Sequence, residues 1–500
     1  MSASREKNKR KELAANDAAE KETTAKKGMS KSLKTVLTIV CVVLVVAIVA
    51  FFAMMQNGFF ASHTTAAIAS GHKLSPAMMN YFYRDAFNQV SSYASYFGID
   101  TEKPLRDQIM NEETGETWAD YFMEQGAATA STSLAIYDEA KAKGFELDEA
   151  GKASIDETVG MFNLYAAYAG AANADAYLAA YYGTGCNTKN FRDYAEIATV
   201  ANLYANEVNT GFTYSADELA AEYAANVQSY DGVTYRLFTI TDSFFSSSDD
   251  AEGTDYTEKK ETLANAMLEA IGDSEDAFIA ESKVNAPEAS AESYEDESYT
   301  KHEDIAYGAC PSAIADWLFD SARVPNECDV LEADGVYYVI MFLNRDTHDY
   351  QLPGVHHILI EVAEDADEVT KDAAKAQAEA ILNEYSSGEQ TYEAFAALGD
   401  KYLADGTSVE ATLYENIEPG KMVTAFNDWC FDETRQEGDV GIVETEYGFH
   451  VMYFYGLGKT YRDSQVETAL RNADYKAWQD AATADASYEL KNFGMRFVTK

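Results

Sequence analysis

The chain has 500 residues, too many for one compact domain, and its 47% hydrophobic content excludes an intrinsically disordered protein. Its 38 Lys and Arg residues stand against 84 Asp and Glu, a formal net charge of −46. Nucleic-acid binding relies on Lys and Arg side chains that neutralise phosphates, so we expect no nucleic-acid partner.

The charge divides at one apolar segment. Residues 1–34 hold 10 basic and 5 acidic residues, and the remainder holds 28 and 79. Between them, Thr35–Met55 is a run of 21 residues without a charge. As a helix it would span about 31 Å, close to the bilayer core. Because the basic residues precede it, the positive-inside rule predicts a cytoplasmic tail (1–34), a transmembrane anchor (35–57) and an extracytoplasmic remainder, in a single-pass protein of the cell membrane.

Two other interpretations of this segment are weaker. A cleaved signal peptide has a shorter apolar stretch, although Ala61–His63 resembles a poor cleavage site. A lipoprotein would need a small residue before its lipidated Cys, and Val40 precedes Cys41. The five cysteines fit no zinc or CxxC spacing, so disulfides and buried thiols both remain open.

Residues 58–230 carry apolar side chains at three- and four-residue spacing, which predicts an all-α domain. Gly144 is a candidate helix end and Ser215–Glu218 a candidate helix start. The Ala- and Tyr-rich stretch from Met161 to Tyr182 is typical of a helix–helix core. The alternative is that exposed Tyr side chains grip unfolded chains.

After Tyr230 the pattern changes, because Val233–Ile240 (VTYRLFTI) is typical of a strand. The acidic, Ser-rich stretch from Ser243 to Asp304 is expected to be surface loop with one helix near Glu258–Ile271. Residues 461–500 are expected to form a C-terminal helix and tail that pack on an earlier domain.

An internal repeat is the most informative feature of the chain. Ala313–Arg323 (AIADWLFDSAR) and Ala425–Arg435 (AFNDWCFDETR) share six of eleven residues at an offset of 112. Similar hairpin patterns follow both, in Val330–Phe342 and Gly441–Phe454. The sequence therefore predicts two tandem α/β domains, at 231–347 and 353–458, each with an antiparallel sheet and flanking helices.

The second repeat contains His357–Leu359 (HIL), a helical stretch at Tyr392–Tyr402, GKMVxxF at Gly420–Phe426 and EGDVGxVxTxxGxH at Glu437–His450. In order and spacing it resembles the parvulin family of peptidyl-prolyl isomerases, over about one fifth of the chain. The resemblance implies a small antiparallel sheet with two histidines facing each other, and no cofactor or metal.

Carried over residue by residue, the resemblance makes His357 and His450 the paired histidines of the catalytic site. It places Asp405 at the family's Cys or Asp position and Thr445 at the hydroxyl that bonds within the histidine pair. Met422 and Phe426 would form the apolar floor that holds the proline ring. The family's Gly-rich loop is replaced by Ser408–Gly420 (SVEATLYENIEPG), so the rim of the groove differs.

The first repeat lacks this site. We expect it to be inactive, with binding or spacing as its role. The sequence pattern aligns His357 with Tyr235, His450 with Tyr337 or Tyr338, Met422 with Cys310, and Phe426 with Ile314.

An anchored, exported chain of this order is similar to the foldases of bacterial export, in which N-terminal helices form a chaperone module. The expected function is an extracytoplasmic prolyl isomerase and chaperone for secreted polypeptides with X-Pro bonds, anchored in the lipid bilayer through residues 35–55. One alternative is a non-enzymatic membrane-anchored holdase with two degenerate domains. Another is an adhesion or scaffold protein.

Overall fold

The computed structural model describes residues 6–15, 31–245 and 254–499. Residues 16–30 of the predicted basic tail and 246–253 of the acidic stretch therefore lie outside the described residues. The chain divides into two compact units, which we call unit 1 (Met1–Gly211 with Lys476–Lys500) and unit 2 (Phe212–Tyr475).

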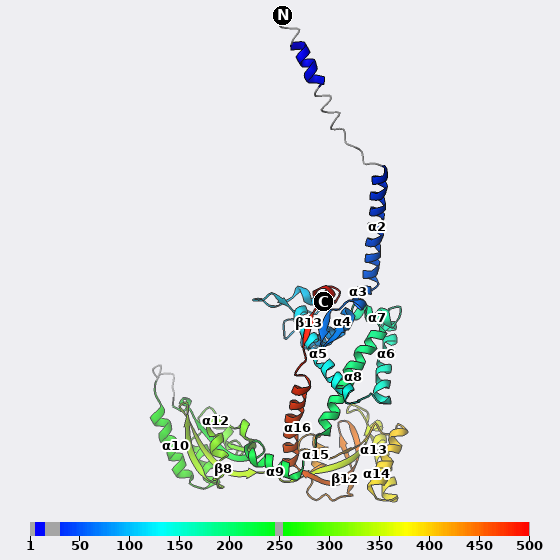
Figure 1. Cartoon of the computed structure of the whole chain (residues 1–500). Helices are drawn as coiled ribbons and strands as arrows, with labels where there is room; N and C mark the ends of the chain where they lie inside the picture. The colour runs from blue at the N-terminus through cyan, green and yellow to red at the C-terminus, as the bar shows by residue number, and fades with distance from the viewer. Residues whose placement is uncertain (1–5, 16–30, 246–253, 500) are drawn as a thin grey trace. The chain divides into compact units, whose positions relative to one another are not determined.

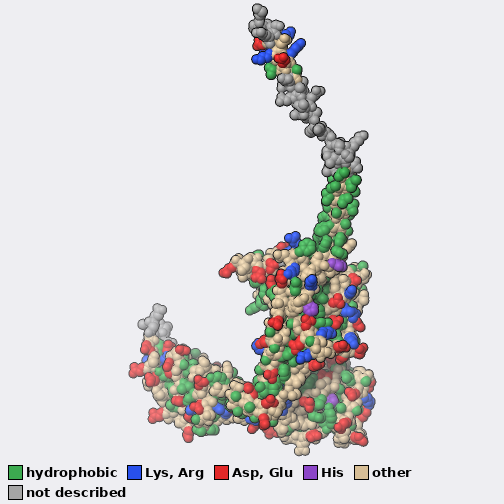
Figure 2. All heavy atoms as spheres, viewed as in Figure 1, with side chains coloured by type: hydrophobic (Ala, Val, Ile, Leu, Met, Phe, Trp, Pro, Cys, Tyr) green, Lys and Arg blue, Asp and Glu red, His purple; other side chains and the backbone are tan. Residues whose placement is uncertain are grey.

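The predicted apolar segment forms one continuous helix, α2 (Lys31–Gln56). Its stretch Thr38–Gln56 has a mean hydropathy of 3.0 and is not buried against the rest of the protein. Figure 2 shows this stretch as a rod covered by hydrophobic side chains. By its length and composition, α2 can cross a membrane once.

The rest of unit 1 is mainly helical, as the three- and four-residue spacing predicts (Figure 1). Helix ends fall where the sequence indicates: α5 stops just before Gly144, which adopts a φ of 82°. The helices that follow α2 are α3 (Phe59–His63), α4 (Pro76–Ser91), α5 (Trp118–Ala142), α6 (Glu149–Tyr168), α7 (Ala174–Tyr181) and α8 (Thr188–Gly211).

The prediction that residues 58–230 are helical throughout is wrong at two hairpins. One joins β1 (Ala67–Ala69) to β2 (His72–Leu74) through Ser70 and Gly71, both at positive φ. Its outer edge pairs with β13 (Tyr488–Leu490) of the C-terminal tail, an antiparallel partner that local spacing cannot reveal. The other hairpin joins β3 (Ile109–Asn111) to β4 (Glu116–Thr117).

Helices α4 and α5 cross closely at Gly126. A Cβ atom added there would lie 2.9 Å from the backbone carbonyl of Phe82. Around this crossing lie fully buried side chains of both helices, including Met79, Tyr81 and Phe122. The absence of a side chain at Gly126 thus sets the distance between the two helices.

We expect Gly126→Ala to destabilise unit 1 by about 1–3 kcal/mol, because the new methyl group must push α4 and α5 apart. Gly160→Ala is the matched control. Gly160 also lies inside a helix, but nothing would lie within 4 Å of its added Cβ. This variant should be stabilised by about 0.5–1 kcal/mol through helix propensity. Hydrogen exchange of the α4 and α6 amides measures both changes, and equal effects would contradict the prediction.

Unit 2 contains two four-stranded antiparallel sheets and their helices, preceded by α9 (Ala216–Ala225). The first repeat consists of β5 (Gly232–Ile240), α10 (Thr257–Ile271), α11 (Glu275–Val284), β6 (Lys301–Ala306), α12 (Ser312–Leu318), β7 (Cys328–Ala333) and β8 (Val336–Asp346). The second consists of β9 (Gln351–Glu361), α13 (Glu368–Ser387), α14 (Tyr392–Ala404), β10 (Glu410–Tyr414), α15 (Thr424–Cys430), β11 (Val440–Thr445) and β12 (Gly448–Thr460), before α16 (Tyr461–Ala482).

The two sheets have the same topology. Their strand orders are β6-β5-β8-β7 and β10-β9-β12-β11, so corresponding strands occupy corresponding places. In each repeat, two helices pack on one face of the sheet and a short helix packs on the other. The internal repeat of the sequence is therefore a repeat of the fold.

Sheet register changes one of the predicted correspondences. His357 lies opposite Met452 on β12, and the equivalent of Met452 in β8 is Ile340. Leu237 lies opposite Ile340, so Leu237 rather than Tyr235 occupies the position of His357. The sequence alignment missed this shift because Tyr235 and Leu237 lie on the same face of β5, and an alternating strand pattern looks the same after a shift of two residues.

The acidic stretch is more ordered than the predicted surface loop. It contains the expected helix, α10, but also α11 and the edge strand β6. Phe278 of α11 is fully buried in the core of the first repeat. The buried Arg236 also draws this stretch inward, with Nε 2.8 Å from Oε1 of Glu275. These contacts depend on residues distant in sequence, which composition alone does not predict.

All five cysteines are free thiols. Cys186, Cys310 and Cys430 are buried in the cores, where burial raises the pKa of each thiol. Of the two alternatives left open by the sequence, disulfides and buried thiols, the structure contains buried thiols.

Candidate active site

The candidate site lies on the face of the second sheet that α15 covers. Strands β9 and β12 pair at its centre, with His450 opposite Leu359 and Met452 opposite His357. This register makes His357 and His450 diagonal neighbours on one face. The adjacent His356 points to the other face, against Tyr392 and Phe395, as strand alternation predicts.

The two histidines form the centre of a hydrogen-bonded chain. Nδ1 of His357 lies 3.0 Å from Nδ1 of His450. On one side, Nε2 of His450 is 2.8 Å from the hydroxyl of Thr445. On the other, Nε2 of His357 is 3.3 Å from Oε1 of Glu410, and the Tyr414 hydroxyl donates to that oxygen at 2.6 Å.

These contacts fix the direction of the hydrogen bonds. Ionised Glu410 only accepts, so Nε2 of His357 carries its proton and Nδ1 of His357 accepts from Nδ1–H of His450. Nε2 of His450 then accepts from the Thr445 hydroxyl, whose oxygen accepts the Tyr447 backbone N–H at 3.1 Å. The contact with Glu410 is not aligned along the N–H direction, so it acts mainly through charge. Both histidines are neutral in this arrangement.

Burial supports the neutral state. His357 is 3% exposed and His450 is 5% exposed. Burial lowers the pKa of His357, while the charge of Glu410 opposes that shift. Burial and the neighbouring His357 together lower the pKa of His450 to about 4. The hydrogen bond from Tyr414 lowers the pKa of Glu410 and keeps it ionised.

Aromatic rings enclose the histidine pair. The edge of Phe426, on α15, meets both imidazoles, with centroids 5.4 Å from His357 and 5.4 Å from His450. Tyr414 stacks on His357 with an interplanar angle of 24°. Met422 packs beside this cluster and is half-buried. The result is a dry, neutral, aromatic site whose outer wall reaches solvent at Met422 and Tyr414.

A comparison with known protein families decides what this arrangement is. Residues 337–454 match the family described as the PPIC-type PPIase domain. The chain contains a parvulin-type peptidyl-prolyl isomerase domain. Its match begins in β8 and ends within β12, so it includes β9, β10, β11 and the first half of β12. Among curated proteins, no match to the chain was found.

The parvulin domain brings together five of the six residues expected at its site: His357, His450, Thr445, Met422 and Phe426. It does not bring Asp405 to them. Asp405 is exposed at the end of α14, where its carboxylate accepts the backbone N–H of Thr407 at 2.9 Å. That local turn holds Asp405 away from His357, and Glu410 supplies the carboxylate instead.

Sequence reasoning missed Glu410 and Tyr414, which lie within the stretch expected to form an altered loop. This stretch contains the edge strand β10, in which Thr412 lies opposite His357. Residues two apart on a strand share a face, so Glu410 and Tyr414 flank His357. The alternation of Glu410, Thr412 and Tyr414 was the available signal.

The lowered pKa of His450 predicts a pH-dependent stability. Its pKa is about 4 in the folded domain against an ordinary value of 6.5. Below about pH 6.5 the unfolded chain binds this proton more readily, so stability falls as the pH drops from about 6.5 to about 4. The loss from this residue is at most about 3 kcal/mol.

Hydrogen exchange of the β9 and β12 amides, corrected for intrinsic rates, measures this loss. His450→Asn removes the titrating group, so the variant should lose less stability than the wild type over the same pH range. An equal loss in both proteins would contradict the prediction.

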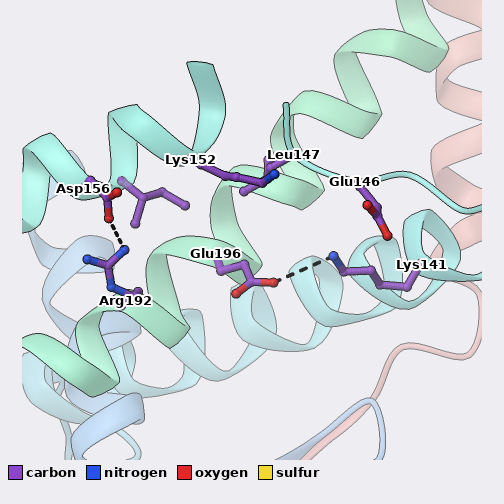
Figure 3. Close-up of a pocket in the computed structure, with 8 residues that line it drawn as sticks. Lys141, Glu146, Leu147, Lys152, Asp156, Arg192 and Glu196 are labelled. Carbon is purple, nitrogen blue, oxygen red and sulfur yellow. Dashed lines mark hydrogen bonds and ion pairs between the residues drawn. The ribbon is translucent and has the colours of Figure 1, made fainter. Parts of the chain in front are cut away.

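Figure 3 shows a charged cavity of about 380 Å³ in unit 1. Its lining holds three basic and three acidic side chains, so its formal charges cancel. Lys141 pairs with Glu196, Arg192 with Asp156, and Lys152 with Glu149 outside the drawn set, while Glu146 makes no ion pair with another described residue. Such internally paired charges are already satisfied, and they give no reason to expect a charged ligand.

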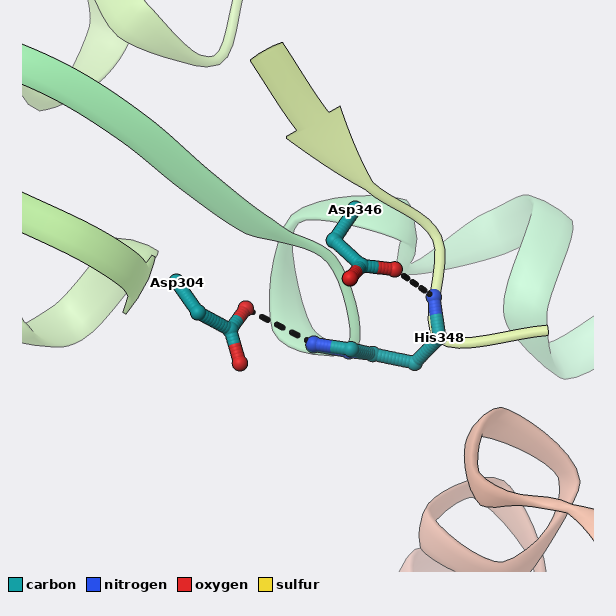
Figure 4. A group of neighbouring side chains, drawn as sticks. All are labelled: Asp304, Asp346 and His348. Carbon is teal, nitrogen blue, oxygen red and sulfur yellow. Dashed lines mark hydrogen bonds and ion pairs between the residues drawn. The ribbon is translucent and has the colours of Figure 1, made fainter. Parts of the chain in front are cut away.

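Asp304, Asp346 and His348 of unit 2 are grouped closely enough to suggest a metal site (Figure 4). Nε2 of His348 is 2.7 Å from Oδ1 of Asp304, and Nδ1 is 2.7 Å from the Tyr230 carbonyl. A metal between Nε2 and Oδ1 would hold them more than about 3 Å apart. Both ring nitrogens face acceptors, so His348 carries two protons. Burial lowers its pKa, but these hydrogen bonds and the charge of Asp304 outweigh burial and raise it.

Proposed function

We propose that the chain is a membrane-anchored extracytoplasmic foldase that catalyses prolyl isomerisation in newly secreted polypeptides. The observation that carries this proposal is the buried, neutral histidine pair inside the matched parvulin domain. The apolar helix α2 supports the anchor. The excess of basic residues before α2 supports an orientation with unit 2 outside the cytoplasm.

The site is suited to rotation about an X-Pro bond without a covalent step. The barrier to that rotation is about 18–20 kcal/mol because twisting removes amide resonance. In the twisted state the nitrogen is pyramidal and the carbonyl is less polarised, so a dry pocket favours it over the planar, well-solvated amide. Met422 and Phe426 would hold the proline ring, and the ordered histidine pair would keep the pocket rigid and uncharged.

The first repeat would then serve binding or spacing. It has the topology of the parvulin domain, but Leu237 and Tyr338 occupy the positions of His357 and His450. Tyr338, and not Tyr337, is the equivalent of His450, because Tyr337 faces the opposite core. Neither Leu nor Tyr can reproduce the paired imidazoles, so we propose that this repeat is a degenerate parvulin-like domain.

A chaperone role for unit 1 is supported by an exposed stripe on α6. Met161, Leu164, Tyr165 and Tyr168 follow the three- and four-residue spacing of one helix face, and Tyr168 is 83% exposed. Phe162 and Ala166 of the same helix are buried in the core. The Tyr-rich stretch thus has one face in the core and one exposed face, to which we assign the binding of unfolded chains.

The test uses the full chain in detergent, an X-Pro tetrapeptide and an unfolded client. We expect the wild type to accelerate isomerisation and suppress aggregation of the client, and His450→Ala to lose only the first activity. If both proteins leave isomerisation at the uncatalysed rate, the enzymatic role fails, and suppression of aggregation would then favour the holdase alternative. Protease treatment of intact cells tests the orientation, because an extracytoplasmic unit 2 is cleaved from outside.

A further inference from the structure

A second cavity in unit 1 has the features of a ligand site. It measures about 390 Å³, within the range of small-molecule pockets. Its walls come from α4, the end of α7, the segment between α4 and β3, and Thr499 near the C-terminus. They are mostly aromatic or apolar, with four rings, from Tyr83, Phe87, Tyr181 and Tyr182, and the buried Leu105.

Arg84 places a positive charge in this cavity. Its guanidinium carbon lies 4.6 Å from the ring centre of Tyr181 and 5.4 Å from that of Phe87. No carboxylate lies within ion-pairing distance of it among the residues that the structure describes. Its Nε is shielded from solvent and has no hydrogen-bond partner in the described part of the chain.

The acidic residues nearby are engaged elsewhere. Asp85 accepts a hydrogen bond from Tyr194, and burial raises its pKa, as expected of a carboxyl without a cationic partner. Asp100 pairs with Lys103 at 2.8 Å, which neutralises the second cation at the rim. Among the residues that the structure describes, Arg84 is therefore the uncompensated charge of this pocket, in a protein with more than twice as many acidic as basic residues.

The geometry selects a class of ligand. Two rings lie within cation–π distance of the guanidinium carbon, and the planar guanidinium carries its N–H donors along its edge. That edge matches a planar oxyanion with two oxygens. Lys103 is neutralised by Asp100, so Arg84 supplies one positive charge, which matches a monoanion better than a multiply charged anion such as a phosphate. The aromatic walls favour an apolar body behind the charge.

We propose that this pocket binds a monoanionic carboxylate attached to an apolar or aromatic group, with Arg84 as the carboxylate-binding residue. The carboxyl end of a peptide with an aromatic last residue carries this chemistry, as does a free aryl-alkanoic acid. The site is separate from the parvulin domain and does not depend on the proposed isomerase function.

Calorimetric titration of the full chain in detergent tests the proposal with three probes: acetyl-Ala-Ala-Phe with a free carboxylate, the same peptide as its amide, and phenylpropionate. We expect the free peptide to bind at least about tenfold more tightly than the amide, since the amide lacks the charge that pairs with Arg84. Binding of phenylpropionate as tight as that of the peptide would assign the site to small acids. Much weaker binding of phenylpropionate than of the free peptide would assign the site to the carboxyl ends of peptides.

Arg84→Gln should reduce binding of the free peptide at least about tenfold, and Arg84→Lys should restore only part of it because an ammonium lacks the planar edge. Arg106→Gln is the matched control, since it removes the same charge from an exposed position close to the pocket, and it should change affinity less than about twofold. Isomerase activity should be the same in all three variants. Equal binding of acid and amide, or unchanged binding in Arg84→Gln with a native melting curve, would overturn the proposal.

Discussion

Glu410→Ala and His450→Ala should each lower kcat/KM for an X-Pro peptide at least about tenfold, whereas Asp405→Ala should leave it within about twofold. His450 shares a hydrogen bond with His357, and removing it leaves Nδ1 of His357 without its partner. Glu410 acts on Nε2 of His357 mainly through its charge, and removing it takes away the charge that favours the proton on that nitrogen. Asp405 is exposed and hydrogen-bonds within its own turn. The measurement is a protease-coupled or NMR-exchange assay on the full chain.

Two further variants separate the effect of the Glu410 charge from the effect of the hydrogen bonds that position the histidines. Because Glu410 acts on His357 mainly through its charge, Glu410→Gln, which keeps the shape of the side chain but not the charge, should lose about as much activity as Glu410→Ala. Thr445→Ser keeps the hydroxyl that donates to His450 and should be nearly as active as the wild type. If Asp405→Ala proves as damaging as His450→Ala, the arrangement around Glu410 is not the active one.

Phe426→Ala should be the most damaging single substitution in the parvulin domain, with losses of both stability and activity. Phe426 is 3% exposed and touches both imidazoles. Truncation of such a ring leaves a cavity and costs about 3–5 kcal/mol. It also opens the proposed proline site to water, so kcat/KM should fall by more than about tenfold below the melting temperature. Hydrogen exchange of the β9 amides and the isomerase assay measure the two effects.

The internal repeat supplies the control for this substitution. Ile314 occupies the equivalent position in the first repeat and is fully buried there. Ile314→Ala should destabilise its own sheet by about 2–5 kcal/mol and leave isomerase activity unchanged. Loss of activity in Ile314→Ala would mean that the first repeat takes part in catalysis, and an active Phe426→Ala would contradict the role of this ring.

Most of the site could be predicted from the sequence because its residues lie in motifs with fixed local spacing. His450 and Thr445 lie in one hairpin. Phe426 lies in the short helix α15, and Met422 lies just before that helix. The carboxylate could not be predicted in the same way. Asp405 and Glu410 are five residues apart, and only the pairing of β10 with β9 decides which of them meets His357.

The fold shows the same division between local and distant contacts. Periodicity and capping residues predicted the helices of unit 1. In unit 2, the capping box at Ser215 begins α9 as expected. The small sheet of unit 1 was missed because β13 comes from the opposite end of the chain. The ordering of α11 and β6 was missed for the same reason, since their partners lie on β5 and β8.

By itself, the sequence determined the apolar helix, the repeated sheet domain and the paired histidines, because each is encoded by residues close together in the chain. The uneven charge also belongs to the sequence and indicates an orientation for α2. Only the tertiary structure decided that Glu410 lies beside the histidine pair, that Leu237 replaces His357 in the first repeat, and that Arg84 faces a cavity with no acidic partner in the described part of the chain. Each of these depends on strand register or helix packing, which bring together side chains that no local pattern relates.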